Sequence, residues 1–211
     1  METSRSPAIP PAPDAPSRRQ RILHAAFALF MQRGYAGTST LAIASAAKVS
    51  KRDLYSEFAG KRDILAACVK ARSRAMQAPL DLPPPCTRDE LVALLIRYGA
   101  GLRQGVAEPE VIATYRLIVQ EAASAPEIAE TLHAEGRMAS FQAVRGLMQA
   151  AQAAGLLGAG PPELMAAQFL SLLVADLILQ HLLGTAEPET AANAHAHAAQ
   201  AAAAVMRLFP V

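Results

Sequence analysis

The chain has 211 residues, of which 52% are hydrophobic and 18% charged, and its formal net charge is +2. This length allows a sizeable core in one large domain or two small ones, and the abundance of alanine and leucine favours helices over strands. No Gly-rich phosphate loop, G-x-S-x-G or H-E-x-x-H pattern occurs in the sequence, so we do not expect an enzyme.

The charge is unevenly distributed along the chain. Residues 18–74 contain 12 Lys and Arg residues and 3 Asp and Glu residues, whereas residues 88–211 contain 7 and 12. Such a division predicts a basic module that binds a polyanion, joined to an acidic module with a different role.

The N-terminal third begins with a proline-rich stretch, residues 1–16, which is typical of a disordered arm and lacks the apolar core of a signal peptide. Ser17 is a suitable N-cap for the first helix, and Gly34 ends it. A tight turn is expected at Lys48. Periodicity and capping signals predict helices over 18–33, 39–47, 51–58 and 61–78.

The proline-rich segment 78–86 cannot continue a helix and is expected to connect two modules. Beyond it, helices are predicted over 87–104, 109–123, 126–154, 162–183 and 188–208, which makes an all-α fold of about nine helices. The most apolar run, FLSLLVADLILQHLLG, is interrupted by Asp176 and Gln180 and is expected to be too short to span a membrane.

The segment from Ser39 to Phe58 mixes apolar and charged residues as two packed helices would. The positions expected to be buried are Ile43, Ala44, Ala47, Val49, Leu54 and Phe58. Ser50 and Asp53 form an S-x-x-D capping pattern that fixes the start of the second helix. Lys51 and Arg52 lie at that start, where a DNA-reading helix reaches base edges. The spacing predicts a helix-turn-helix, and the alternative is a solvated charged helix in a bundle.

The stretch RILHAAFALFMQRGYAGTSTLAIASAAKVSKRDLYSEFAGKRDIL resembles the N-terminal domain of the TetR family of transcriptional regulators. The matching positions are Ile22, Ala25, Ala26, Leu29, Phe30, Gly34, Tyr35, Thr38, Ser39, Ile43, Ala44, Val49, Ser50, Leu54, Tyr55, Phe58 and Lys61. The resemblance implies a helix-turn-helix at 39–58 within a DNA-binding domain at 17–77.

The same resemblance implies the roles of individual residues. Phosphate contacts are expected from Ser39, Tyr55 and Lys61, and base contacts from around Thr40, Lys51, Arg52 and Ser56. Three residues depart from the family pattern: Lys48 replaces the usual turn glycine, Leu41 a frequent basic residue and Ala42 a frequent acidic one. The departures at 41 and 42 weaken the expectation of a base contact from the second helix and shift specificity toward Lys51 and Arg52.

Lys48 is a separate case. If the turn requires a positive φ, lysine costs about 1 kcal/mol relative to glycine. A phosphate contact from its ammonium group would compensate for that cost.

Residues 109–183 resemble the C-terminal dimerisation and ligand-binding domain of one subgroup of the family, so residues 78–211 are expected to have both roles. The implied partners are a palindromic operator in double-stranded DNA, an unidentified small-molecule effector and a second copy bound through residues 162–208. The implied function is a cytoplasmic repressor that the effector releases. Two alternatives stay open: a helical ligand-binding protein without specific DNA binding, and a TetR-like activator.

Several residues could line an effector pocket, with ordinary core packing as the alternative for each. The candidates are Tyr98, Tyr115, Arg116, His133, Arg137, Phe141, Phe169 and Asp176. Asp176 could instead lie at the subunit interface or in solvent. No cofactor or metal is expected, because His195 and His197 point in different directions on a helix. Cys68 and Cys86 are expected to be reduced thiols.

Overall fold

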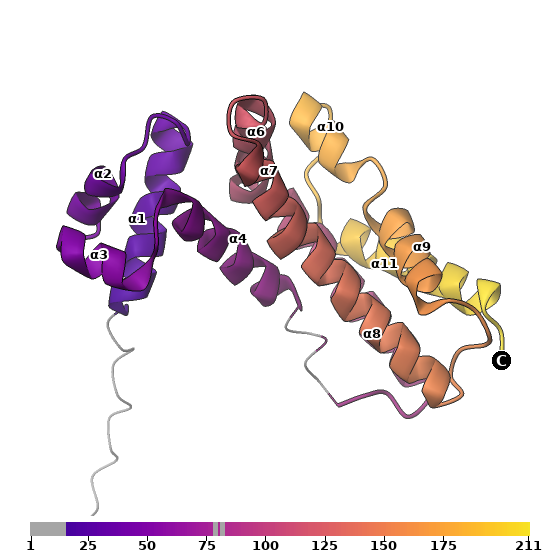
Figure 1. Cartoon of the computed structure of the whole chain (residues 1–211). Coiled ribbons are helices and arrows are strands. Elements are labelled where there is room, and N and C mark those ends of the chain that lie inside the picture. The colour runs from indigo at the N-terminus through magenta and orange to yellow at the C-terminus, as the bar shows by residue number, and fades with distance from the viewer. Residues whose placement is uncertain (1–15, 78–79, 81–82) are drawn as a thin grey trace, which may run out of the picture.

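The structure is a computed structural model that describes residues 16–77, 80 and 83–211. All regular secondary structure in these residues is helical, as predicted (Figure 1). The predicted N-terminal arm lies outside the described residues except for Pro16, and so does part of the predicted connection at 78–86.

The N-terminal helices form a group at one end of the molecule (Figure 1). They are α1 (Arg18–Arg33), α2 (Thr40–Ala46), α3 (Lys51–Glu57) and α4 (Lys61–Gln77). Ser17 caps α1 through a capping box with Gln20, and Gly34 ends the helix with a φ of 73°. The four helices therefore begin and end within one residue of the predicted positions.

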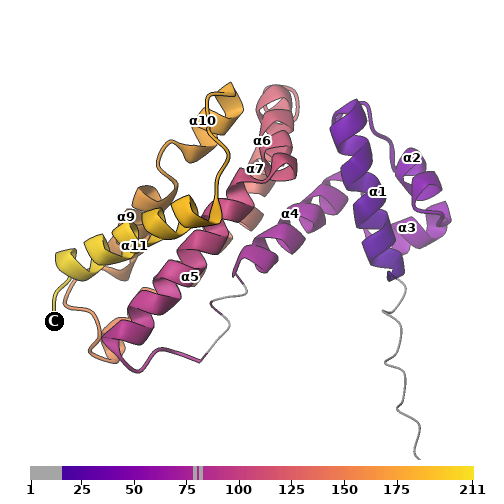
Figure 2. The same cartoon turned by 180° about the vertical axis from the view of Figure 1, so that it is seen from behind.

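The C-terminal helices pack into a second, larger group (Figure 2). They are α5 (Arg88–Ala107), α6 (Pro109–Glu121), α7 (Pro126–Leu132), the π-helical turn η2 (His133–Met138), α8 (Ala139–Ala153), α9 (Pro162–Val174), α10 (Leu177–Leu183) and α11 (Ala191–Leu208). With α7, η2 and α8 taken as one continuous helix and α9 and α10 as one broken helix, the described residues form the nine predicted helices.

The predicted helix over 162–183 is not continuous. Ala175 has a φ of 28°, which is rare for a residue other than glycine, and it separates α9 from α10. At the same place the guanidinium group of Arg103 donates a hydrogen bond to the carbonyl group of Leu173. In an unbroken helix that carbonyl group would accept from the backbone of residue 177. The break in the helix therefore coincides with a long-range contact.

The broken helix is also longer than the apolar run FLSLLVADLILQHLLG, which is expected from its sequence to be too short to span a membrane. Pro162–Leu183 has 22 residues and contains an 18-residue window with a mean hydropathy of 1.6, which by length and composition alone would suffice to cross a bilayer. However, Met165, Phe169 and Leu173 are buried in the protein core. A core helix with one face exposed passes the same test, so this segment does not indicate a membrane protein.

The described residues contain two apolar cores. The larger one lies among α5, α8, α9 and α11, where Tyr98 and Phe169 are fully buried. The smaller one lies among α1–α4 but also includes Leu117, Ile118 and Ile128, which belong to α6 and α7. The core of the N-terminal helices is therefore completed by residues that lie much later in the chain.

Candidate nucleic-acid interface

Helices α2 and α3 meet as the two helices of a helix-turn-helix. Ser39 caps α2 by accepting from the backbone N–H of Ala42 at 3.1 Å, and Ser50 caps α3 by accepting from that of Asp53 at 3.0 Å. The predicted core positions Ile43, Ala44, Ala47, Leu54 and Phe58 are buried, and Val49 is half-buried. These contacts fix the angle between the helices and leave the first turn of α3 in solvent.

The turn between the two helices has the backbone conformation anticipated for a glycine. Lys48 has a φ of 54°. Its N–H donates to Ser45 O at 3.1 Å, and the N–H of Val49 donates to Ala44 O at 3.0 Å, which are the two bonds of a Schellman motif. The requirement for a positive φ is thus confirmed, and lysine meets it at a cost of about 1 kcal/mol.

The start of α3 is held by Ser50 and Asp53. The Ser50 hydroxyl accepts from the Asp53 amide and also donates to the Asp53 carboxylate, Oγ to Oδ2, at 2.6 Å. This hydrogen bond is the main cause that lowers the pKa of Asp53, and the Ser50 backbone amide and the charges of Arg18 and Arg52 contribute further. Asp53 is therefore a carboxylate at neutral pH, as the capping pattern requires.

Two arginines of α1, Arg18 and Arg19, bind residues of α3. These contacts were not predicted from the sequence. Arg18 binds Asp53 at 3.1 Å and Glu57 at 2.9 Å. Arg19 donates to the carbonyl group of Glu57 at 3.2 Å and lies over the ring of Phe58, 4.3 Å from its centroid. A signal was present in the sequence, because Asp53 and Glu57 are four residues apart and share one face of α3.

The predicted DNA-contacting residues are mostly exposed. Lys48, Lys51 and Arg52 are exposed, and no described acidic group pairs with them. Tyr55 is 46% exposed, and its hydroxyl lies 3.1 Å from that of Thr40, which links α3 to the first turn of α2. Three unpaired cations and several hydroxyl groups on one helix-turn-helix form a surface suited to phosphates and base edges.

Two other predicted contacts are partly occupied within the chain. The Ser56 hydroxyl donates to Asp53 O at 2.8 Å. The ammonium group of Lys61 donates to Tyr35 O at 2.7 Å and lies 4.3 Å from the centroid of the Tyr35 ring. Lys61 is therefore half-buried, and only part of its donor capacity is free for a phosphate.

Polar contacts connect the C-terminal helices to the N-terminal group. Glu121 at the end of α6 accepts from the N–H of Ala36 at 3.3 Å. Arg62, Lys70 and Arg72 project from α4, and their partners are Glu130, Glu135 and Glu108, respectively. A movement of α6, α7 or η2 would thus reach the helix-turn-helix through α4 and through the loop after α1.

Comparison with known families gives two matches, which together cover most of the chain. Residues 22–68 match the profile described as bacterial regulatory proteins, tetR family, and residues 93–209 match the AefR-like transcriptional repressor C-terminal domain. The chain belongs to the TetR family of transcriptional regulators. It is accordingly a DNA-binding transcriptional regulator, and members of this family are generally not enzymes.

Solved structures of TetR-family proteins have the same fold. A regulator from Agrobacterium tumefaciens is 26% identical, with a TM-score of 0.75 over 92% of this chain and 95% of that one. The flavonoid-responsive regulator FrrA is 27% identical, with a TM-score of 0.73 over 91% and 96%. One from Mesorhizobium loti MAFF303099 is 21% identical, with a TM-score of 0.73 over 92% and 97%, and supports the fold alone. The search of curated proteins gave no match.

The eight predicted effector-pocket residues do not form one cluster. Tyr98 and Phe169 are buried with ring centroids 6.4 Å apart, and Phe141 packs against the same core. His133 and Asp176 are exposed, so Asp176 does not line an enclosed cavity of the single chain.

Tyr115 and Arg116 are consecutive and point to different sides of α6. Burial raises the pKa of Tyr115, and the nearby charge of Arg137 opposes that rise. Arg116 instead donates to the carbonyl group of His181 on α10 at 2.8 Å. Only part of the predicted set can therefore surround a common ligand.

The hydroxyl group of Tyr98 is buried without a hydrogen-bond partner that meets normal geometry. Burial raises the pKa of Tyr98 to about 12, although the nearby Ser140 hydroxyl opposes part of this rise. Oε1 of Gln168, next to Phe169 on α9, is likewise buried without a partner. Buried polar atoms without partners are uncommon and costly, so each of these two atoms marks a place where a bound molecule could supply a hydrogen bond.

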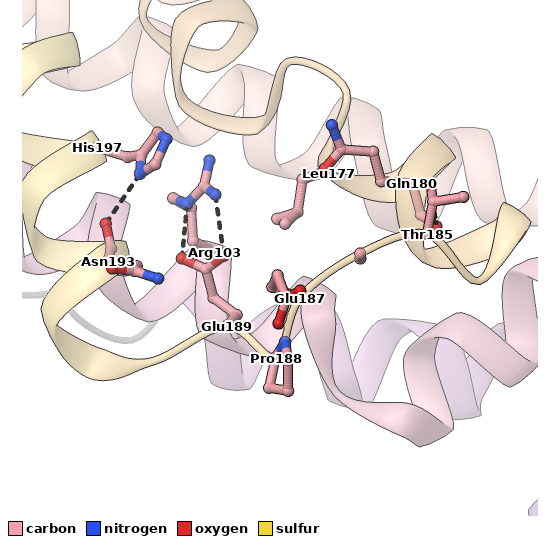
Figure 3. A pocket seen from close by; sticks show the side chains of 10 residues that line it. Arg103, Leu177, Gln180, Thr185, Glu187, Pro188, Glu189, Asn193 and His197 are labelled. Atoms are coloured by element: carbon pink, nitrogen blue, oxygen red, sulfur yellow. Dashed lines mark hydrogen bonds and ion pairs between the residues drawn. The ribbon is translucent and has the colours of Figure 1, made fainter.

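A surface groove of about 430 Å³ lies between α5, α10 and α11 (Figure 3). Within it, Arg103 forms a bidentate ion pair with Glu189, with both N–O distances 3.0 Å, and the backbone carbonyl group of Asn193 accepts from Nδ1 of His197 at 3.0 Å. The side chains of Arg103 and Glu189 are only 6% and 7% exposed. These polar groups use their hydrogen-bonding capacity on one another. The groove is therefore better described as a contact between α5, the segment before α11 and α11 than as a ligand-binding site.

Proposed function

We propose that the protein is a homodimeric repressor that binds a palindromic operator through α3 and leaves it when a small molecule binds the C-terminal core. The observation that carries DNA binding is the exposed, unpaired set Lys48, Lys51 and Arg52 on a helix-turn-helix held by caps and ion pairs. The match of residues 93–209 to an AefR-like repressor domain supports repression rather than activation.

Dimerisation is supported by apolar side chains left in solvent on the C-terminal helices. Leu164, Leu172, Leu179 and Leu183 are exposed along α9 and α10. Ala192 and Ala196 are exposed four residues apart on α11, where small side chains allow close approach of another helix. Patches of this kind on a soluble protein mark association surfaces, and a two-fold dimer would present two copies of α3 to one side of DNA.

The dimer can be tested by substitution on this face. Leu172→Glu should convert the protein to a monomer in sedimentation or light-scattering measurements. Leu41→Glu is the matched control, because Leu41 is also an exposed apolar residue but lies on α2, which packs against α1 and α3 in the N-terminal group. If both variants stay dimeric, the interface lies elsewhere.

The proposed effector site surrounds Tyr98, between α5, α8 and α9. The unpartnered hydroxyl of Tyr98 and the stacked ring of Phe169 suit an aromatic molecule that carries a hydroxyl group. The likeness to FrrA makes flavonoids reasonable first candidates. Binding there would move α8 and the preceding η2 and α7, which contact α4, and so change the spacing of the two α3 helices.

DNA binding is tested by titrating the dimer with its own upstream region and with random DNA at several salt concentrations. Specific binding with a steep salt dependence supports the proposal. Arg52→Ala should reduce discrimination between operators, whereas Lys61→Ala should weaken binding to all DNA about equally. A dimer that shows no preference for its upstream region would be a ligand-binding protein rather than a repressor.

Effector response is tested by adding flavonoids to the protein–operator complex and measuring the concentration that releases the DNA. Tyr98→Phe should bind the operator normally but require a higher effector concentration, because it cannot donate the hydrogen bond. Tyr115→Phe is the control. Equal shifts in both variants would argue against a specific role for the Tyr98 hydroxyl.

A further inference from the structure

Leu41 is a large apolar side chain exposed to solvent within the helix-turn-helix. It is 65% exposed on the first turn of α2. Within residues 16–77, the only other large hydrophobic side chain of comparable exposure is that of Tyr55, at 46%. The other large aliphatic side chains of α1–α3 pack into the core or against it, which leaves Leu41 without an obvious structural role; they are Ile22, Leu23, Leu29, Met31, Ile43 and Leu54.

The position of Leu41 is tied to that of the reading helix. Its neighbour Thr40 meets the hydroxyl of Tyr55 at 3.1 Å, so the first turn of α2 adjoins the middle of α3. The exposed cations Lys51 and Arg52 lie one turn before Tyr55 on α3. The first turn of α2, which carries Leu41, therefore adjoins the surface that carries the positive charge, and the exposed Leu41 side chain does not belong to the core that joins these helices.

DNA offers few apolar groups to a side chain in this position. In the major groove, the exposed apolar group on a base edge is the C5 methyl group of thymine. An arginine or lysine at position 41 would read guanine or phosphate, but leucine can do neither because it has no donor. The leucine side chain can therefore recognise a base only by apolar contact with the thymine methyl group.

We infer that Leu41 reads a thymine in each operator half-site by contact with its C5 methyl group. This inference rests on the proposed DNA-binding function and adds a specificity-determining residue to it. It also assigns a base contact to α2, where the departures at positions 41 and 42 weakened that expectation. The contact requires the methyl group itself, so it distinguishes thymine from uracil, which pairs identically with adenine.

The test uses the duplex that full-length wild-type protein selects from random-sequence DNA. Each thymine is replaced in turn by deoxyuridine, which removes only the methyl group, and the dissociation constant is measured. At one symmetric position, replacement in both half-sites should weaken binding by more than replacement elsewhere, with a loss of about fourfold per half-site, as expected for one buried methyl group. In Leu41→Ala, the same replacement should have no effect, and in Leu41→Met the effect should remain.

Val119→Ala is the control, because it shortens an exposed apolar side chain on α6 and should keep the full response to deoxyuridine. Thermal unfolding should be unchanged in Leu41→Ala, since this side chain contributes little to the core. If no thymine is sensitive, or if Leu41→Ala keeps the sensitivity, the inference is wrong while DNA binding stands. If wild-type protein selects no sequence, the proposed function and this inference fail together.

Discussion

Two systems of ion pairs hold helices in place in this protein, and they differ in burial. In the N-terminal domain, Arg18 binds Asp53 and Glu57 on α3 while about 46% of its side chain is exposed. In the C-terminal domain, Arg103 binds Glu189 with both side chains almost completely buried. An exposed network contributes little stability and can yield to a phosphate, whereas a buried pair cannot be broken cheaply. The first suits a surface that meets DNA, and the second suits a fixed scaffold.

The largest expected change in the free energy of unfolding comes from removing one partner of the buried ion pair between Arg103 and Glu189. Glu189→Ala should lower the free energy of unfolding by about 3–5 kcal/mol in chemical denaturation, because Arg103 is left buried without its partner. The control is Glu187→Ala, since Glu187 is exposed on the same segment and should change stability by less than about 0.5 kcal/mol.

A double variant sharpens the point. Arg103→Met together with Glu189→Leu removes both charges and should recover most of the stability lost in Glu189→Ala. If Glu189→Ala proves as mild as Glu187→Ala, the contrast between the two ion-pair systems would disappear.

An intermediate effect is expected at the turn between α2 and α3. Lys48→Gly should raise the free energy of unfolding by up to about 1 kcal/mol, because glycine adopts the positive φ without strain. The same variant should bind operator DNA more weakly, since a cation is lost from the DNA-facing surface. Lys48→Ala separates the two effects, because it loses the charge and keeps the strain. A stabilised Lys48→Gly with unchanged DNA affinity would remove Lys48 from the interface.

The smallest stability change is expected for Arg18→Ala, because its ion pairs are exposed. The free energy of unfolding should fall by less than about 1 kcal/mol. Affinity for the operator should nevertheless fall, since α3 loses the contacts from Arg18 to Asp53 and Glu57. Arg33→Ala, an exposed arginine on the last turn of α1, is the control for loss of charge alone. Equal losses of affinity in both variants would show that Arg18 acts through charge and not by positioning α3.

Local signals in the sequence predicted the N-terminal domain well. The caps Ser17 and Ser50, the end at Gly34 and the positive φ of Lys48 all depend on residues within a few positions of one another. The apolar spacing also identified the residues that pack α2 against α3. Hydrogen bonds between residues that are close in the sequence determine these features, so the features can be predicted from the sequence pattern.

Contacts between distant segments were not predictable in the same way. The break at Ala175 coincides with Arg103, which is 70 residues from the carbonyl group it binds. Lys61 donates a hydrogen bond to the carbonyl group of Tyr35, which is 26 residues away in the sequence. The residues next to Lys61 contain no signal of this contact. Tyr115 and Arg116 were grouped because both could bind a ligand, but consecutive helical residues point about 100° apart. The effector residues remain the least determined part of the site for this reason.

The inclusion of Leu117, Ile118 and Ile128 in the N-terminal core has a consequence for how the chain is made. Synthesis proceeds from the N-terminus, so α1–α4 are made before residues 117–128. Until then the DNA-binding helices lack part of their apolar partners and expose the surface that those residues will cover. Newly made chains therefore acquire a finished DNA-reading surface only after more than half of the protein, including α6 and the start of α7, has been translated.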